Sequence, residues 1–332
     1  MTDLFQAKWH RVGWQGIELT VPEDWNIGGI GGGRDDGYLR LQDAELPRVE
    51  VKWGAAEGFV DIDKTVDGYV RKLRQDRKLG RSIEIDTDAS VVSKRKMRKK
   101  GLRCFTWRAD VSGHGAAWYC PDCSRTVLIQ VTARLDEDGE KLAERVIGSL
   151  QDHPVGGWIR WASYGFDAEA PEDFGLTAQK LMAGHIQITL KRDVVAASGR
   201  SIMLQNFVPP EELTLSRWGM ANVLLKKRSL RQWAEEEMGK RLKRMRPELE
   251  PAQVNGHEAV QVSAQRLFFH QQLFRLVARF ADAPYADRIR GLIWHCPEGN
   301  SLHLVQMLID VSDEDLPGEI AGRFVCHPRD AV

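Results

Sequence analysis

Segments in which apolar and polar residues alternate open the first half of the chain. In residues 16–22 apolar side chains occupy every second position, and residues 38–41 and 49–53 repeat the pattern. A period of two is typical of a strand with one buried face. Three such segments in succession predict an antiparallel meander of strands.

Helical periodicity interrupts these strand patterns at a few places. From residue 61 apolar residues fall on one stripe, at Val66, Tyr69, Val70 and Leu73, and residues 142–150 form a similar stripe. In the second half Ser229 is followed by Gln232, the spacing of a capping box at a helix start. We expect these helices to cover a face of the sheet.

The second half of the chain repeats the landmarks of the first half in the same order. Trp9 and Pro22 return as Trp158 and Pro171, and Trp-x-Cys-Pro at residues 118–121 returns at 294–297. His153-Pro154 returns as His327-Pro328. Collinear landmarks predict a tandem duplication, with repeats at residues 1–154 and 155–332 and an insertion of about 29 residues in the second.

A glycine-rich segment at residues 26–37 invites comparison with phosphate-binding loops. Its glycines fail the dinucleotide-binding spacing, because Arg34 stands where the last glycine is needed. No Gly-Lys-Ser/Thr follows, as a P-loop requires. We therefore interpret the segment as a hairpin connection.

The composition is that of an ordinary globular chain with two domains. Of the 332 residues, 42% are hydrophobic and 28% are charged, and Lys plus Arg equals Asp plus Glu at 47 each. The balanced charge leaves no overall attraction to nucleic acid. No apolar run approaches the roughly 18 residues of a membrane span, and the first residues lack a signal-peptide pattern. We expect a cytoplasmic protein that does not insert into a membrane.

Cysteines give the sharpest chemical signal. Cys120 and Cys123 have the spacing of a zinc-ligand pair, and His295 and Cys296 would complete a tetrahedral set if the repeats meet. A redox role is disfavoured because a strand pattern follows Cys120, and Gly299 replaces Cys123 in the second repeat. The alternative is that these small side chains fill the core. Zinc is the cofactor that the spacing leaves open.

Two further sets of residues are candidates for binding a partner. The first is apolar, consisting of Trp118 and Trp294 together with an aromatic segment in the second repeat at Phe268, Phe269 and Phe274. The second is a dense basic run at Lys94, Arg95, Lys96 and Arg98, with a basic helix at residues 240–246. A basic patch would suit RNA or an acidic partner.

Catalytic motifs are missing from the sequence. It contains neither a Gly-x-Ser-x-Gly elbow nor a His-Glu-x-x-His helix, and His114 and His270 are isolated. We therefore expect a protein that is not an enzyme.

The layout of each repeat resembles the PsbP-like superfamily, which includes the photosystem II extrinsic protein, the Ran-release factor and Eag-type effector chaperones. The resemblance lies in Gly-Ile-Glu-Leu-Thr-Val-Pro-Glu-Asp-Trp at residues 16–25, an early helix, a meander and a last helix with Ile-Gly-Ser-Leu at 147–150. It implies an α+β fold, here as two curved antiparallel sheets flanked by helices and related by a pseudo-twofold. It also implies a protein partner rather than catalysis, and no catalytic residue is carried over.

The function expected from the sequence is therefore that of a non-enzymatic adaptor or chaperone with a groove between two fused repeats. A zinc-binding protein and a binder of RNA or an acidic partner remain as alternatives.

Overall fold

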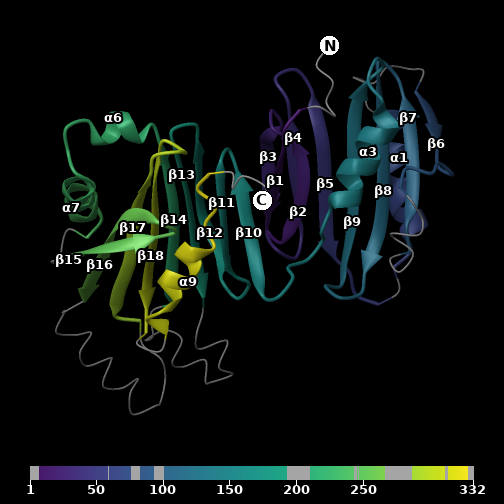
Figure 1. Ribbon diagram of the computed structural model, residues 1–332. Coiled ribbons are helices and arrows are strands. Elements are labelled where there is room, and N and C mark those ends of the chain that lie inside the picture. Colours follow the sequence, from purple (N-terminus) through teal and green to yellow (C-terminus); the bar gives the residue numbers. More distant parts are fainter. Residues whose placement is uncertain are drawn as a thin grey trace. The chain divides into compact units, whose positions relative to one another are not determined.

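The computed structural model describes residues 7–58, 60–75, 83–92, 101–192, 210–242, 245, 247–265, 286–310 and 313–327. The chain divides into two compact units, unit 1 at Met1–Tyr164 and unit 2 at Gly165–Val332 (Figure 1). The division falls ten residues after the repeat boundary expected at 154/155. Among the described residues, no helix is long and apolar enough to cross a membrane.

Strands dominate both units, so the expected α+β class is wrong. Of the described residues, 52% lie in strands and 19% in helices, and the strands form three antiparallel sheets. The helical stripes are real, but they are few and short. Segments without apolar alternation also pair as strands: the glycine-rich residues interpreted as a connection form β3 (Asn26–Gly32), hydrogen-bonded to β4 (Gly37–Gln42). Backbone pairing needs no particular side chain, which is why side-chain alternation underestimates strand content.

Unit 1 is built on a seven-stranded antiparallel sheet in the order β3-β4-β5-β9-β8-β7-β6. Its other strands are β5 (Pro47–Ala55), β6 (Glu84–Asp86), β7 (Arg103–Arg108), β8 (Val111–Cys120) and β9 (Arg125–Arg134). The predicted helices are present as α1 (Ile62–Gln75) and α3 (Gly139–Ser149). The apolar stripe of α1, including Val66 and Val70, packs in one buried cluster with Phe105 and Trp107 of β7.

Unit 2 has a second seven-stranded sheet, in the order β12-β13-β14-β18-β17-β16-β15. Counted from the start of each repeat, this is the same strand order as in unit 1, as a tandem duplication requires. The described strands of unit 2 are β11 (Phe166–Pro171), β12 (Gly175–Met182), β13 (His185–Arg192), β14 (Glu211–Gly219), β15 (Glu248–Val254), β16 (His257–Gln265), β17 (Arg288–Cys296) and β18 (Ser301–Ile309), of which β11 lies outside this sheet. Its helices are α6 (Ala221–Leu225), α7 (Leu230–Arg241) and α9 (Leu316–Gly322).

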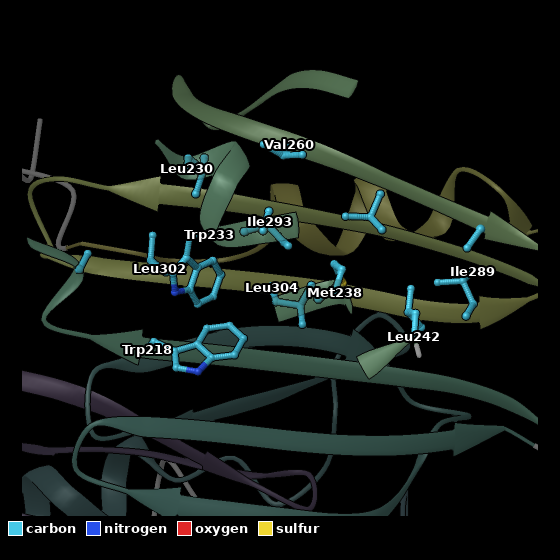
Figure 2. Close-up of a cluster of buried hydrophobic side chains, with 14 residues drawn as sticks. Trp218, Leu230, Trp233, Met238, Leu242, Val260, Ile289, Ile293, Leu302 and Leu304 are labelled. Carbon is cyan, nitrogen blue, oxygen red and sulfur yellow. The ribbon is translucent and has the colours of Figure 1, made fainter. Parts of the chain in front are cut away.

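Helix α7 covers one face of the unit 2 sheet. Its N-terminus has the predicted capping box, in which Ser229 and Gln232 bond to each other's backbone N–H groups. Trp233 of α7 packs edge-to-face on Trp218 of β14 at 5.1 Å between ring centroids, and Met238 lies over the same face (Figure 2). The helix therefore closes the core that these strands cannot bury by themselves.

Strand β10 (Trp158–Ser163) explains why unit 1 extends beyond the first repeat. By sequence it opens the second repeat, yet it pairs antiparallel with β1 (Trp9–Trp14), and β1 also pairs with β2 (Ile17–Pro22). Gly13 lies opposite Ala162, its equivalent in the repeat. The contact is tight, because a Cβ at Gly13 would lie 2.6 Å from the carbonyl oxygen of Arg160.

Substituting Gly13 with valine is expected to destabilise unit 1 by about 2 kcal/mol, since the new side chain meets backbone that must move. Urea denaturation followed by circular dichroism measures the loss. Gly54→Val is the matched control, because Gly54 also lies in a strand and a Cβ there meets nothing within 4 Å. Equal destabilisation by both variants would contradict the close β1–β10 contact.

Candidate functional site

The repeated Trp-x-Cys-Pro motif ends the first strand of a tight hairpin in each unit. Strands β8 and β9 are joined at residues 121–124, and β17 and β18 at residues 297–300. Ser124 and Asn300 hold the same left-handed backbone position, with φ of 52° and 41°. The cysteine that precedes each turn, Cys120 or Cys296, is fully buried. The two units therefore share one hairpin geometry at the repeated motif.

In unit 2 four potential metal ligands converge at this hairpin: His257, Cys296, Cys326 and His327, whose ligand atoms all lie within 4.8 Å of one another. The Sγ of Cys296 is 3.3 Å from Nδ1 of His327, and the Sγ of Cys326 is 3.4 Å from the same nitrogen. Nε2 of His257 is 3.3 Å from the Sγ of Cys326. Two thiols and two imidazoles thus face a common point.

Three separate segments of unit 2 supply these side chains. His257 begins β16 directly after a turn at Asn255 and Gly256, both with positive φ. Cys296 ends β17. Cys326 and His327 follow α9, where the backbone N–H of Val325 bonds to the carbonyl of Asp167 in β11 at 2.9 Å. The cluster lies where the C-terminal segment meets the sheet.

Burial makes both hairpin cysteines poor nucleophiles. It raises the pKa of the Cys296 thiol to about 12 and that of the Cys120 thiol to about 11. At neutral pH the metal-free side chains are protonated thiols, and the thiolate is the reactive form. A raised thiol pKa disfavours a redox pair, whose attacking cysteine needs thiolate character.

Unit 1 has a related but incomplete group of Cys120, Cys123 and His153. The Sγ of Cys120 is 3.4 Å from Nδ1 of His153, the same pairing as that of Cys296 with His327. The repeat places Asp152 where unit 2 has Cys326, and Oδ1 of Asp152 lies 2.8 Å from Nδ1 of His153. The Nε–H of buried Arg125 donates to the Sγ of Cys123 at 3.5 Å. A cation of the protein already lies beside these sulfurs.

Three of the four predicted zinc ligands therefore belong to two separate groups, one in each unit. Cys120 and Cys123 lie together with His153, and Cys296 lies with His257, Cys326 and His327, whereas His295 belongs to neither group. Cys326 and His257 are not among the ligands predicted from the sequence. The repeat held a signal for the histidines, since His153 and His327 are collinear landmarks just as Cys120 and Cys296 are.

The predicted partner-binding residues have different outcomes. Trp118 and Trp294 are fully buried, so neither indole is open to a partner. Both belong to the core, which was the alternative interpretation of the motif. The other predicted residues lie outside the described part of the chain: Phe268, Phe269, Phe274, Lys94, Arg95, Lys96 and Arg98.

Three arginines in or just before α7 are paired with acids of that helix. Arg241 bonds to Glu237 at 2.9 Å, and Arg231 bonds to Glu235 at 3.1 Å. Nη1 of Arg228, just before the helix, bonds to Glu236 at 2.5 Å. These pairs compensate much of the positive charge that would attract RNA to this helix.

Strand β12 is an edge of the unit 2 sheet and is exposed along its length. Six of its eight residues are exposed, and Leu176 and Leu181 are partly buried. At its end Met182 is 58% exposed, and Met220, just before α6, is also 58% exposed. The Cε of Met220 lies 3.9 Å from the position of a Cβ on Gly184, in the turn after β12, and Val223 of α6 is 50% exposed. Met182, Met220 and Val223 are called the β12 apolar rim below.

No protein-family model matches the chain, and no curated protein matches it. Among solved structures the chain is similar to the Tle4-Tli4 complex, with 8% identity over 96% of this chain and 98% of that chain and a TM-score of 0.34. It is also similar to immunity protein TplEi of T6SS from Pseudomonas aeruginosa complexed with "L" peptide. The identity is 8% over 97% of this chain and 99% of that chain, with a TM-score of 0.31. It is also similar to a protein from Bacteroides thetaiotaomicron, with 12% identity over 77% of this chain and 86% of that chain and a TM-score of 0.23. Likenesses at these TM-scores assign neither a fold family nor a function, and the PsbP-like resemblance stays a prediction.

Proposed function

We propose that this protein is a non-enzymatic binding protein whose partner is another protein, and that the partner adds an extended segment to the free edge of β12. The observation that carries the proposal is the exposure of an eight-residue edge strand beside the β12 apolar rim. An edge strand offers a row of unpaired N–H and C=O groups, and an added strand satisfies them. The rim would give the partner's side chains an apolar contact.

The other described edges of the two seven-stranded sheets are protected against such pairing. β15 carries Pro251 and the acidic residues Glu248 and Glu250, and β6 has only three residues. β3 is mostly half-buried, and the hydroxyl of Tyr164 donates to the carbonyl of Ile27. Proline, charge, short length and covering side chains are the usual protections of edge strands. Strand β12 has one register irregularity, between Leu176 and Ala178. From Ala178 onward, the described residues show none of these protections for β12 beyond the charge of Lys180.

One of the similar structures is the Tle4-Tli4 complex, and another is the immunity protein TplEi with a bound peptide. The proposal for this chain comes from its own surface. The predicted groove between the repeats and the predicted chaperone role stay predictions beside it.

The test begins with a photo-crosslinking amino acid at position 179, in β12, in the native host. Mass spectrometry identifies the crosslinked partner, and titration calorimetry then compares variants against the purified partner. Met182→Glu and Met220→Glu are expected to weaken binding at least tenfold, about 1.4 kcal/mol each, because a charge in an apolar contact loses its hydration. Leu135→Glu is the matched control, since Leu135 is a 48% exposed apolar residue of unit 1.

Backbone pairing is tested separately by proline. In an antiparallel strand the N–H groups of successive residues point in opposite directions. Of the two variants Gln179→Pro and Lys180→Pro, one therefore removes a hydrogen bond to β13, and the other removes only an N–H donor on the free edge. The variant that keeps the wild-type melting temperature is expected to lose partner binding. Unchanged affinity in that variant and in both glutamate variants would reject β12 as the binding site.

A further inference from the structure

We propose that unit 2 holds one structural zinc ion, bound by Nε2 of His257, Sγ of Cys296, Sγ of Cys326 and Nδ1 of His327. This site is distinct from the β12 edge and goes beyond the proposed function. It also differs from the ligand set expected from sequence, since all four ligands come from one unit and only Cys296 is shared with that set.

The spacing of the ligand atoms fits a tetrahedral ion. Zinc binds sulfur at about 2.3 Å and nitrogen at about 2.0–2.1 Å, so neighbouring ligand atoms in a tetrahedron lie roughly 3.3–3.8 Å apart. Three of the four sulfur–nitrogen distances in the cluster are 3.3, 3.4 and 3.3 Å, and all four ligand atoms lie within 4.8 Å of one another. Two sulfurs and two nitrogens in this arrangement are typical of zinc, and four protein ligands are typical of a structural site.

Hydrogen bonds within the protein offer each thiol of the cluster an acceptor, since Cys296 faces Glu298 and Cys326 faces Nε2 of His257. Nδ1 of His327 faces both Cys296 and Cys326, but a neutral imidazole nitrogen has one lone pair and accepts well from one thiol. A cation at the common point gives each of the four ligand atoms a partner.

The surroundings of the cluster also suit metal ligands. While Nε2 of His257 faces the cluster, Nδ1 lies 3.8 Å from Oε2 of Glu298, and a carboxylate behind a histidine ligand is a common supporting arrangement. The backbone N–H of Gly299 donates to the Sγ of Cys296 at 3.2 Å. A Cβ at Gly299 would lie 2.5 Å from the carbonyl oxygen of Cys326 and 3.3 Å from the Sγ of Cys296. Gly299, which replaces Cys123 of the first repeat, therefore leaves room for the cluster.

The ion would join three segments of unit 2: the start of β16, the end of β17 and the stretch after α9. These segments are far apart in the sequence, so the ion would act as a crosslink that fixes the C-terminal stretch to the sheet. Its role is to stabilise this corner of unit 2.

Unit 1 supplies a natural comparison for the test. Its group offers three ligands instead of four, the guanidinium of Arg125 is beside Cys123, and Asp152 lies against the His153 ring. A positive charge and an occupied imidazole nitrogen both disfavour a bound cation. Cys120→Ser is therefore a matched control for Cys296→Ser, since the two cysteines are equivalent in the repeat and both are buried.

The experiment measures zinc per chain by inductively coupled plasma mass spectrometry, after expression with zinc and gel filtration. Cys296→Ser and Cys326→Ser are each expected to lower the zinc content by one ion per chain, and Cys120→Ser is expected to lower it by none. Wild-type protein loaded with Co²⁺ should show the intense visible bands of a tetrahedral ion with two sulfur ligands. X-ray absorption on the zinc form should fit two sulfur and two nitrogen neighbours.

Removal of zinc by a chelator is expected to lower the melting temperature by about 10 °C, because an ion that binds only the folded state stabilises it in proportion to its affinity. The proposal is overturned if Cys296→Ser does not change the zinc content, or if loss of zinc follows Cys120→Ser instead. It is also overturned if Cys296 and Cys326 are found joined in a disulfide by mass spectrometry of the unreduced protein. The wild-type spectra decide the question even where a cysteine variant fails to fold.

Discussion

Arg48→Ala is expected to destabilise unit 1 by about 3 kcal/mol, because removing the most buried partner of an ion-pair network leaves the other charges poorly compensated. Arg48 is 1% exposed. Its Nε donates to Asp43 at 2.6 Å, and its two terminal nitrogens donate to the carboxylate oxygens of Glu137 at 2.6 and 2.8 Å. The variant would leave Asp43 and Glu137 close together without this cation.

The geometry of Arg48 makes lysine a poor replacement. The guanidinium binds Glu137 through two parallel bonds and lies 5.2 Å from the centre of the Trp25 ring. A single ammonium group cannot make the two-pronged contact. Arg48→Lys is therefore expected to recover only part of the loss.

Arg134→Ala is the control for Arg48. Arg134 contacts the same two carboxylates, Asp43 at 3.0 Å and Glu137 at 2.9 Å, but it is 31% exposed. Solvent screens such a pair, so the expected loss is about 1 kcal/mol or less. Urea denaturation of the three variants gives the comparison, and similar losses for Arg48→Ala and Arg134→Ala would contradict the buried network.

Trp118→Phe is expected to destabilise the protein by about 3 kcal/mol, since it removes a hydrogen-bond donor from a buried carboxylate as well as part of a core side chain. Nε1 of Trp118 donates to Oδ2 of Asp152 at 2.6 Å, and both residues are fully buried. The phenylalanine cannot replace this bond.

The equivalent variant Trp294→Phe is expected to cost only about 1 kcal/mol. The indole nitrogen of Trp294 is buried without an acceptor among the described residues, and its ring stacks on His303 at 5.1 Å. Both variants lose the same volume, so their difference reports the Asp152 bond. Thermal denaturation and urea titration measure it, and equal losses would show that the bond contributes nothing.

Divergence between the repeats explains this asymmetry. Where unit 1 has Asp152 to accept from Trp118, unit 2 has Cys326, which faces His257 and His327 instead. The difference between Asp152 and Cys326 thus exchanges a hydrogen bond in the core for a potential metal ligand. The two units share a fold but have different chemistry at the same hairpin.

Local patterns in the sequence determined a good part of the architecture. The alternation at residues 38–41 and 49–53 gave strands β4 and β5, the apolar stripe from residue 61 gave α1, and the Ser229 capping box gave the start of α7. The collinear landmarks also anticipated two sheets of the same strand order. Each of these features depends on residues close together in the chain, where periodicity is readable.

Only the tertiary structure decided the fold class, the limits of the units and the ligand sets. β3 and β12 are strands because their backbones pair, although their side chains do not alternate, and β10 belongs to unit 1 because it pairs with β1. His257 and Cys326 are 69 residues apart, yet Nε2 and Sγ lie 3.3 Å from each other. Contacts of this kind depend on how distant segments meet in the folded sheet, and spacing within the sequence carries no record of them.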